Sequence, residues 1–193
     1  MKTHLLTAHN AFRCSLIIFF LCAVFLLPSR LEAQVSAEAE KALIEARIRV
    51  LKERKNTVNF NLPLLNGGTT ALSSWKGKVV ILNFWATWCP PCRAEMPSME
   101  TFYQRFKSQG LEILAVDIGE EQAAVQQFIK NYNYTFPVLL DKDTKISSQY
   151  GVSAIPTTFI IDRKGMIIGM IAGSIPWDNP KVTAAFEALL KSR

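Results

Sequence analysis

The sequence predicts an α/β domain built on a mixed central sheet, and three observations support this prediction. Two apolar, β-branched runs, 79–85 and 111–118, are typical of strands that are buried on both faces. Segments with apolar residues at helical spacing follow each run. The chain then shows a strand–turn–strand pattern over 156–172 and a last amphipathic segment. This order indicates parallel strands joined to an antiparallel pair.

Length and composition set the broad class. The chain has 193 residues, enough for one domain and a leader. Hydrophobic residues make up 49% and charged residues 20%, which favours a packed core over disorder. The net charge is +6, but the basic residues are scattered, so we expect no nucleic-acid binding.

The first 33 residues are predicted to be a signal peptide or an N-terminal membrane anchor. Lys2 and Arg13 precede an uncharged, largely apolar run over 14–27. This run is shorter than the about 20 residues of a comfortable membrane span and fits the apolar region of a secretory signal. The site after Ala33 lacks the usual small-residue pattern, so cleavage and anchoring both stay open, with a buried core helix as a third alternative.

Residues 34–56 are predicted to be a helical linker. The segment is rich in Ala, Glu, Lys and Arg. Its apolar residues recur at helical spacing, at Ala39, Leu43, Ala46 and Val50. We interpret it as a solvated spacer in preference to a dimerising or partner-binding helix.

Residues 57–193 are predicted to form the domain itself. Alternation at Val58, Phe60 and Leu62, followed by Asn66-Gly67-Gly68, predicts a short N-terminal hairpin. The apolar spacing after Cys92 predicts a helix that ends near Gly110. The remaining predicted elements are a helix over 121–131, a strand over 136–140, one or two helical turns over 144–150, strands over 156–162 and 166–172, and a helix over 182–190.

Only two cysteines belong to the predicted domain. Cys14, Cys22 and both histidines lie within the first 33 residues, which leaves Cys89 and Cys92. Two thiols without histidine do not make a structural zinc site, which needs four ligands. A purely structural disulfide between them would close a loop too short to remove much entropy from the unfolded chain. We therefore interpret the pair as a redox site and expect no metal and no other cofactor.

The chemistry of this site follows from its place at the start of a helix. Unpaired backbone N–H groups and the helix dipole favour a thiolate there. A thiol with a pKa of about 8.5 is only a few per cent ionised at neutral pH, whereas one near 7 is about half ionised. We expect Cys89 to be the nucleophile and Cys92, one turn further on, to be more buried and to resolve the mixed disulfide. Pro91 fits the first helical turn, where an N–H is not needed.

The segment 84–97, FWATWCPPCRAEMP, resembles the active-site segment of TlpA-like and ResA-like thiol:disulfide oxidoreductases. These are extracytoplasmic proteins of the AhpC/TSA-like and Redoxin subgroup of the thioredoxin superfamily. The resemblance extends over about 58–191. It implies a thioredoxin-like fold, a mixed central sheet flanked by helices, with a central helix–strand insertion over 121–140.

The resemblance also assigns a substrate surface, which we define as Trp88, Pro90, Pro91, Ile155 and Pro156. Pro156 matches the cis-proline of the family, which lies opposite the two cysteines. The residue before it, Ile155, would offer its backbone groups to a substrate strand. For Trp88, packing in the core is the alternative.

Glu95 is the candidate acid–base residue. It matches an acidic residue near the active site of ResA-like proteins, where a partly buried carboxyl could exchange a proton with Cys92. The alternative is a glutamate that only favours the helix dipole. Asn83 departs from ordinary thioredoxin, which has a buried aspartate at the matching place. Because asparagine cannot take a proton, Glu95 is the nearest candidate base.

These features predict an extracytoplasmic protein-disulfide reductase, secreted or anchored to the cytoplasmic membrane. The resemblance implies protein substrates, with apocytochrome c as a candidate, and a membrane electron donor. A dithiol oxidase or isomerase and a redox-inactive binding module remain alternatives. A peroxidase is disfavoured because Ala86 stands where peroxiredoxins need threonine, and a copper chaperone because the domain has no histidine.

Overall fold

The computed structural model describes residues 37–192. The predicted signal or anchor over 1–33 therefore lies outside the described residues. Within the described part of the chain, no helix has both the length and the apolar character needed to cross a membrane.

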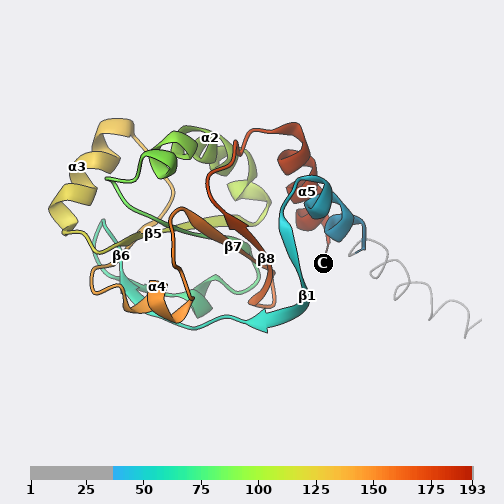
Figure 1. Ribbon diagram of the computed structural model, residues 1–193, viewed down its shortest axis with the longest axis horizontal. Helices are drawn as coiled ribbons and strands as arrows, with labels where there is room; N and C mark the ends of the chain where they lie inside the picture. The colour runs from blue at the N-terminus through green and yellow to red at the C-terminus, as the bar shows by residue number, and fades with distance from the viewer. Residues whose placement is uncertain (1–36, 193) are drawn as a thin grey trace, which may run out of the picture.

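A six-stranded mixed sheet forms the centre of the domain (Figure 1). The strands, in spatial order, are β1 (Arg49–Asn56), β8 (Met166–Ala172), β7 (Thr157–Ile161), β4 (Val79–Trp85), β5 (Leu111–Ile118) and β6 (Val138–Asp141). β4, β5 and β6 run parallel, whereas β7 is antiparallel to both β4 and β8, and β8 is antiparallel to β1. The predicted α/β class with a mixed sheet is confirmed.

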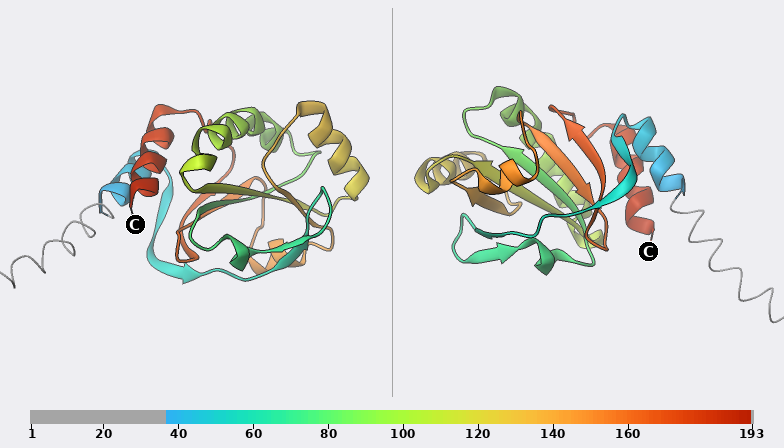
Figure 2. Two further views of the ribbon diagram at one scale, coloured as in Figure 1. Left: turned by 180° about the vertical axis from the view of Figure 1, so that it is seen from behind. Right: turned by 60° about the horizontal axis from the view of Figure 1, so that its bottom comes forward.

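Helices and the small hairpin cover the two faces of this sheet. The helical elements are α2 (Pro90–Phe106), η2 (Lys107–Gln109), α3 (Gln122–Tyr132), α4 (Lys145–Gln149) and α5 (Pro180–Lys191). The predicted hairpin is present as β2 (Asn61–Pro63) and β3 (Thr69–Ala71), followed by the single turn η1 (Leu72–Trp75). α2, α3 and α5 pack on one face, and the hairpin and α4 pack on the other (Figures 1 and 2).

The central strand β4 shows why the sequence is apolar without alternation. All seven of its residues are buried. Ile81 and Trp85 face the layer of α2, whereas Leu82 and Phe84 face the hairpin and α4. A strand covered on both sides has no solvent face for polar residues. Asn83, the one polar residue of β4, is therefore buried on the α2 side, where it needs hydrogen-bond partners.

The prediction of one helix over residues 34–56 is wrong in its second half. Residues 37–45 are helical, but the chain turns at Arg47, which has a φ of 61°, and continues as strand β1. β1 pairs with β8, whose free edge supplies backbone partners that helical periodicity cannot reveal. The spacer interpretation is also wrong, because Ala39 and Leu43 are buried in the core, in a helix that lies beside α5 (Figure 2).

Candidate active site

Cys89 lies at the junction between the central strand and α2. β4 ends at Trp85, and a turn closed by the Cys89 N–H and the Ala86 carbonyl (3.2 Å) leads into the helix. Cys89 is the N-cap of α2, and its Sγ accepts the backbone N–H of Cys92 at 3.3 Å. The prediction that the cysteine pair stands at a helix start is confirmed.

The structure shows the oxidised form of the pair, a disulfide between Cys89 and Cys92. Cys89 is 3% exposed and Cys92 is fully buried, in the predicted order. Pro90 and Pro91 are exposed and occupy the first two helical positions, so they bring no N–H to the helix start. The Cys92 amide is consequently the first N–H of α2, and it is directed at the Cys89 sulfur.

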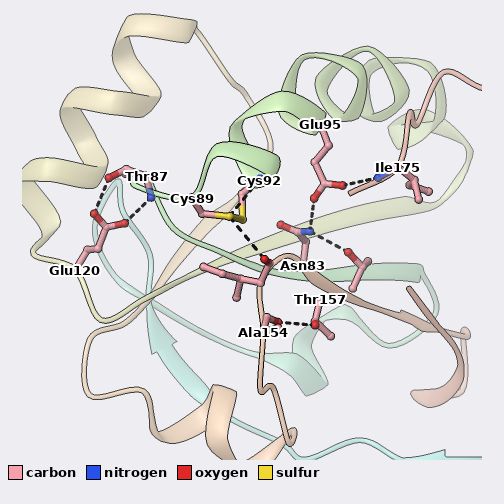
Figure 3. The surroundings of a disulfide bond; sticks show 11 residues. Asn83, Thr87, Cys89, Cys92, Glu95, Glu120, Ala154, Thr157 and Ile175 are labelled. Carbon is pink, nitrogen blue, oxygen red and sulfur yellow. Dashed lines mark hydrogen bonds between the residues drawn. A yellow bond between two sulfur atoms is a disulfide. The ribbon is translucent and has the colours of Figure 1, made fainter. Parts of the chain in front are cut away.

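The cis-proline segment lies opposite the disulfide (Figure 3). The carbonyl oxygen of Ile155 is 3.8 Å from Cys89 Sγ, and the Ile155–Pro156 peptide bond is cis, as the resemblance implied. Trp88 is 64% exposed beside Cys89, so the alternative of a core tryptophan is wrong. The structure thus brings the residues to which the resemblance assigns substrate binding together around the sulfur pair.

Glu95 is buried between α2 and the sheet, with an exposed fraction of 2%. Its Oε1 accepts the side-chain amide of Asn83 at 3.0 Å. Its Oε2 accepts the backbone N–H of Ile175 at 3.2 Å and the indole N–H of Trp177 at 3.3 Å. Figure 3 shows the side chain directed at Asn83 and Ile175. A glutamate that only favoured the helix dipole would not need this buried set of partners.

Burial raises the pKa of Glu95 from 4.5 to about 7. The hydrogen bonds from Ile175, Asn83 and Trp177 act in the opposite direction, because all three donors stabilise the carboxylate. Asn83 also donates to Thr158 Oγ1 on β7 at 2.9 Å. This second bond fixes the Asn83 side-chain amide between Thr158 and the Glu95 carboxyl. A carboxyl that titrates near neutral pH can both give and take a proton under working conditions.

Two further acids near the site were not anticipated from the sequence. Glu120, in the loop between β5 and α3, accepts both the backbone N–H and the hydroxyl of Thr87 at 2.6 Å each (Figure 3). It thereby holds the turn two residues before Cys89. Asp117, near the end of β5, is fully buried, and its two carboxyl oxygens lack a hydrogen-bond partner among the described residues.

Burial raises the pKa of Asp117 to about 9, and the nearby Glu120 carboxylate adds to the rise. At neutral pH Asp117 is therefore protonated. A detectable signal was present in the sequence, since an acidic residue inside a fully buried strand has to be neutralised or paired. Within residues 37–192, no group of three or more His, Cys, Asp or Glu is arranged to hold a metal ion.

The fold and the site together define a class. A mixed sheet carries a Cys-x-x-Cys pair at the start of a helix, and a cis-proline faces the pair across the sulfur atoms. These are the features of a thioredoxin-like thiol–disulfide protein.

Comparison with known proteins narrows this class. Residues 54–170 match the AhpC/TSA family. The thiol-disulfide oxidoreductase ResA of Bacillus subtilis (strain 168) is 46% identical over 125 residues, which cover 65% of this chain and 70% of ResA. ResA of Geobacillus kaustophilus (strain HTA426) is 43% identical over 117 residues, or 61% of this chain and 67% of that protein.

Solved structures that resemble this chain belong to the same class of thiol–disulfide proteins. StoA from Bacillus subtilis is 30% identical with a TM-score of 0.58, covering 66% of this chain and 96% of StoA. A thiol:disulfide interchange protein of the thioredoxin family from Chlorobium tepidum TLS is 29% identical with a TM-score of 0.61, covering 73% and 97%. The chain belongs to the AhpC/TSA family and, within it, to the ResA-like thiol-disulfide oxidoreductases, and it is an enzyme of that class.

Proposed function

We propose that this enzyme reduces protein disulfides outside the cytoplasm, with the dithiol form of Cys89 and Cys92 as the reductant. The observation that carries the proposal is the position of the Cys89 sulfur. It caps α2, accepts the Cys92 N–H and lies 3.8 Å from the Ile155 carbonyl, at the centre of the substrate surface. A thiolate there is stabilised by the helix start and lies against backbone groups that an extended peptide can pair with.

The reaction begins when the Cys89 thiolate attacks one sulfur of a target disulfide. A bond forms between Cys89 and that sulfur, and the second target sulfur leaves as a thiolate. Cys92 then loses its proton and attacks Cys89 Sγ, which breaks the mixed disulfide and releases the other target thiolate. Two electrons have passed to the target, and the enzyme is left as the Cys89–Cys92 disulfide.

Glu95 is the base that we assign to the second step. Cys92 is fully buried and needs a nearby group to receive its proton, because a buried thiol ionises poorly without help. Glu95 lies three residues further along α2, which places the two side chains on one face of the helix. Its pKa of about 7 allows the carboxylate to accept this proton near neutral pH.

Substrate and electron donor follow from the family likeness together with the site. Trp88, Pro90 and Pro91 form an exposed rim beside the sulfur pair that suits a protein partner better than a small molecule. Apocytochrome c, whose haem-binding cysteines can form a disulfide, is the substrate that we propose. A dithiol protein in the membrane would return the enzyme to its reduced form. The uncharged run over 14–27, as a signal or an anchor, supports the extracytoplasmic location.

The main alternatives to this proposal are functions that use the same site in another way. An oxidase or isomerase would use the same sulfur atoms, and a redox-inactive binding module would use the same surface. A peroxidase has less support, because Ala86 precedes Cys89 by three residues and the hydroxyl of Thr87 is bound to Glu120.

The test is the reduction of insulin and of an oxidised apocytochrome c peptide by the wild type and by Cys89→Ala and Cys92→Ala. We expect loss of turnover in both variants and a trapped mixed disulfide in Cys92→Ala alone. Equal activity of wild type and Cys89→Ala would end the enzymatic proposal. A reduction potential near the about −270 mV of thioredoxin supports a reductase, whereas one near the about −120 mV of DsbA supports an oxidase.

A further inference from the structure

Two of the three donors that hold Glu95 come from a single loop, residues 173–179, between β8 and α5. The backbone N–H of Ile175 and the indole N–H of Trp177 both reach Glu95 Oε2, at 3.2 and 3.3 Å. Trp177 is fully buried. Its ring packs against Phe102 and Phe186, with centroids 5.6 and 6.2 Å apart, so the indole N–H has a fixed direction.

The same loop is tied to α2 and to the cis-proline segment. The backbone N–H of Trp177 donates to Ser98 Oγ at 3.1 Å, and Ser98 Oγ in turn donates to the backbone carbonyl of Glu95 at 2.8 Å. At the start of the loop, the Gly173 N–H donates to the Pro156 carbonyl at 2.8 Å. The loop therefore joins the two halves of the site, the helix with the cysteines and the segment opposite them.

We propose that Trp177 is a positioning residue that holds the Glu95 carboxyl beside the sheet and sets the pH range in which Glu95 takes the proton of Cys92. The inference rests on the proposed function for the role of Glu95. The indole N–H of Trp177 donates to Glu95 and not to either cysteine among the described residues, so the effect that we assign to it acts through Glu95.

The direction of its effect follows from the kind of hydrogen bond. An N–H that donates to a carboxylate stabilises the charged form and lowers the pKa. The polar groups in hydrogen-bonding contact with the Glu95 carboxyl are all neutral donors: Asn83 from β4, and Ile175 and Trp177 from the loop. Cys92, one turn earlier on the same helix, is held in the disulfide and does not titrate in the oxidised protein. Removal of the indole donor should therefore move the pKa of Glu95 further upward.

The variant that tests this is Trp177→Phe, which keeps an aromatic ring and removes the donor. We expect the Glu95 midpoint, followed by carbon-13 NMR of its carboxyl in the oxidised protein, to rise by about one unit. The rate at which a mixed disulfide is resolved should show the same upward shift in its pH profile. An unchanged Glu95 midpoint in folded Trp177→Phe overturns the proposal.

The chain offers a matched control in Trp85. Trp85 is also fully buried on the α2 side of the sheet, but its indole N–H has no partner among the described residues. Trp85→Phe removes the same atoms without removing a donor to Glu95, so its Glu95 midpoint should equal that of the wild type. A shift of equal size in this control would assign the effect to general loosening of the core and refute the specific role of Trp177.

A second variant decides the question should Trp177→Phe fail to fold. Ser98→Ala keeps the indole but removes the hydroxyl that holds the Trp177 backbone. We expect a smaller rise of the Glu95 midpoint, and no rise would count against the proposal. The NMR titration needs no substrate. If the wild type fails to reduce disulfides while Trp177→Phe still shifts the Glu95 midpoint, the proposed function fails and the coupling of Trp177 to Glu95 stands.

Discussion

The substitution Glu95→Gln tests both the proposed catalytic role of this carboxyl and its contribution to stability. All three groups that hydrogen-bond to the Glu95 carboxyl are N–H donors: Asn83 on one oxygen, and Ile175 and Trp177 on the other. A glutamine amide has only one acceptor oxygen, so its NH₂ group must face donors on one side. At least one buried donor is left unpaired, at a cost of about 1–3 kcal/mol.

A second effect on stability has the opposite sign. The folded protein raises the pKa of Glu95 from 4.5 to about 7, so ionisation of Glu95 opposes folding. The contribution of protonated Glu95 to the free energy of unfolding is fully present below about pH 4.5 and is lost as the pH rises to about 7. The loss amounts to about 3 kcal/mol for this nearly unexposed group. Glutamine does not ionise and escapes this loss.

The two effects predict a change that depends on pH. At pH 8 the free energy of unfolding of Glu95→Gln should lie within about 2 kcal/mol of the wild-type value, whereas near pH 4.5 the variant should be less stable by about 1–3 kcal/mol. Urea unfolding at the two pH values measures both quantities. Glu100→Gln is the control, because Glu100 lies on the same helix but binds Thr135 and Gln104 at the surface.

The kinetic part of the prediction concerns the resolving step. General base catalysis contributes about 10²–10⁴-fold, so Glu95→Gln should slow the release of a trapped mixed disulfide by about 10²-fold at pH 7.5. In stopped-flow measurements the wild-type rate should rise with pH and level off above a midpoint near 7, and this midpoint should disappear in the variant. A variant that keeps the wild-type rate and midpoint would refute the assignment of Glu95 as the base.

Two further predictions concern stability. Asp117→Asn should flatten the pH profile of unfolding, because the folded state raises the pKa of Asp117 from 3.8 to about 9 and wild-type stability falls as the pH rises between these values. The stability of the variant relative to wild type should grow by up to about 4 kcal/mol between pH 5 and 8, and parallel urea-unfolding profiles of the two proteins would contradict this. Reduction of the Cys89–Cys92 disulfide should lower the free energy of unfolding by about 2 kcal/mol at most, because a loop with a sequence separation of 3 removes little entropy from the unfolded chain. A loss above about 4 kcal/mol, measured by urea unfolding with reductant, would show that the disulfide has a structural role instead.

The fold was largely predictable because its main elements are local patterns. The apolar run at 79–85 is a strand buried on both faces, and the helix after Cys92 follows its apolar spacing. The segment 49–56 was misassigned because most of its side chains are exposed and carry no period-2 pattern. Its strand conformation is fixed by pairing with β8, more than 100 residues later, and no local propensity records that pairing.

The site was predictable in its sulfur chemistry but not in its surroundings. Cys89, Cys92 and Glu95 lie within one stretch of chain, so their spacing on a helix start could be read directly. Trp177 is 82 residues from Glu95, and nothing near it in the sequence indicates which carboxyl its indole meets. The contact between Glu120 and Thr87 likewise depends on the parallel alignment of β4 and β5, which brings the ends of both strands to the same edge.

The two prolines between the cysteines have a consequence for how this enzyme can diverge. Because Pro90 and Pro91 have no backbone N–H, the Cys89 sulfur accepts the backbone N–H of Cys92. Other residues at these two positions would add backbone N–H groups at the positive end of the helix dipole. Both side chains are exposed, so exchanging them leaves the interior untouched. The affinity of this centre for electrons can therefore be adjusted on the surface of the molecule, without repacking the domain that carries it.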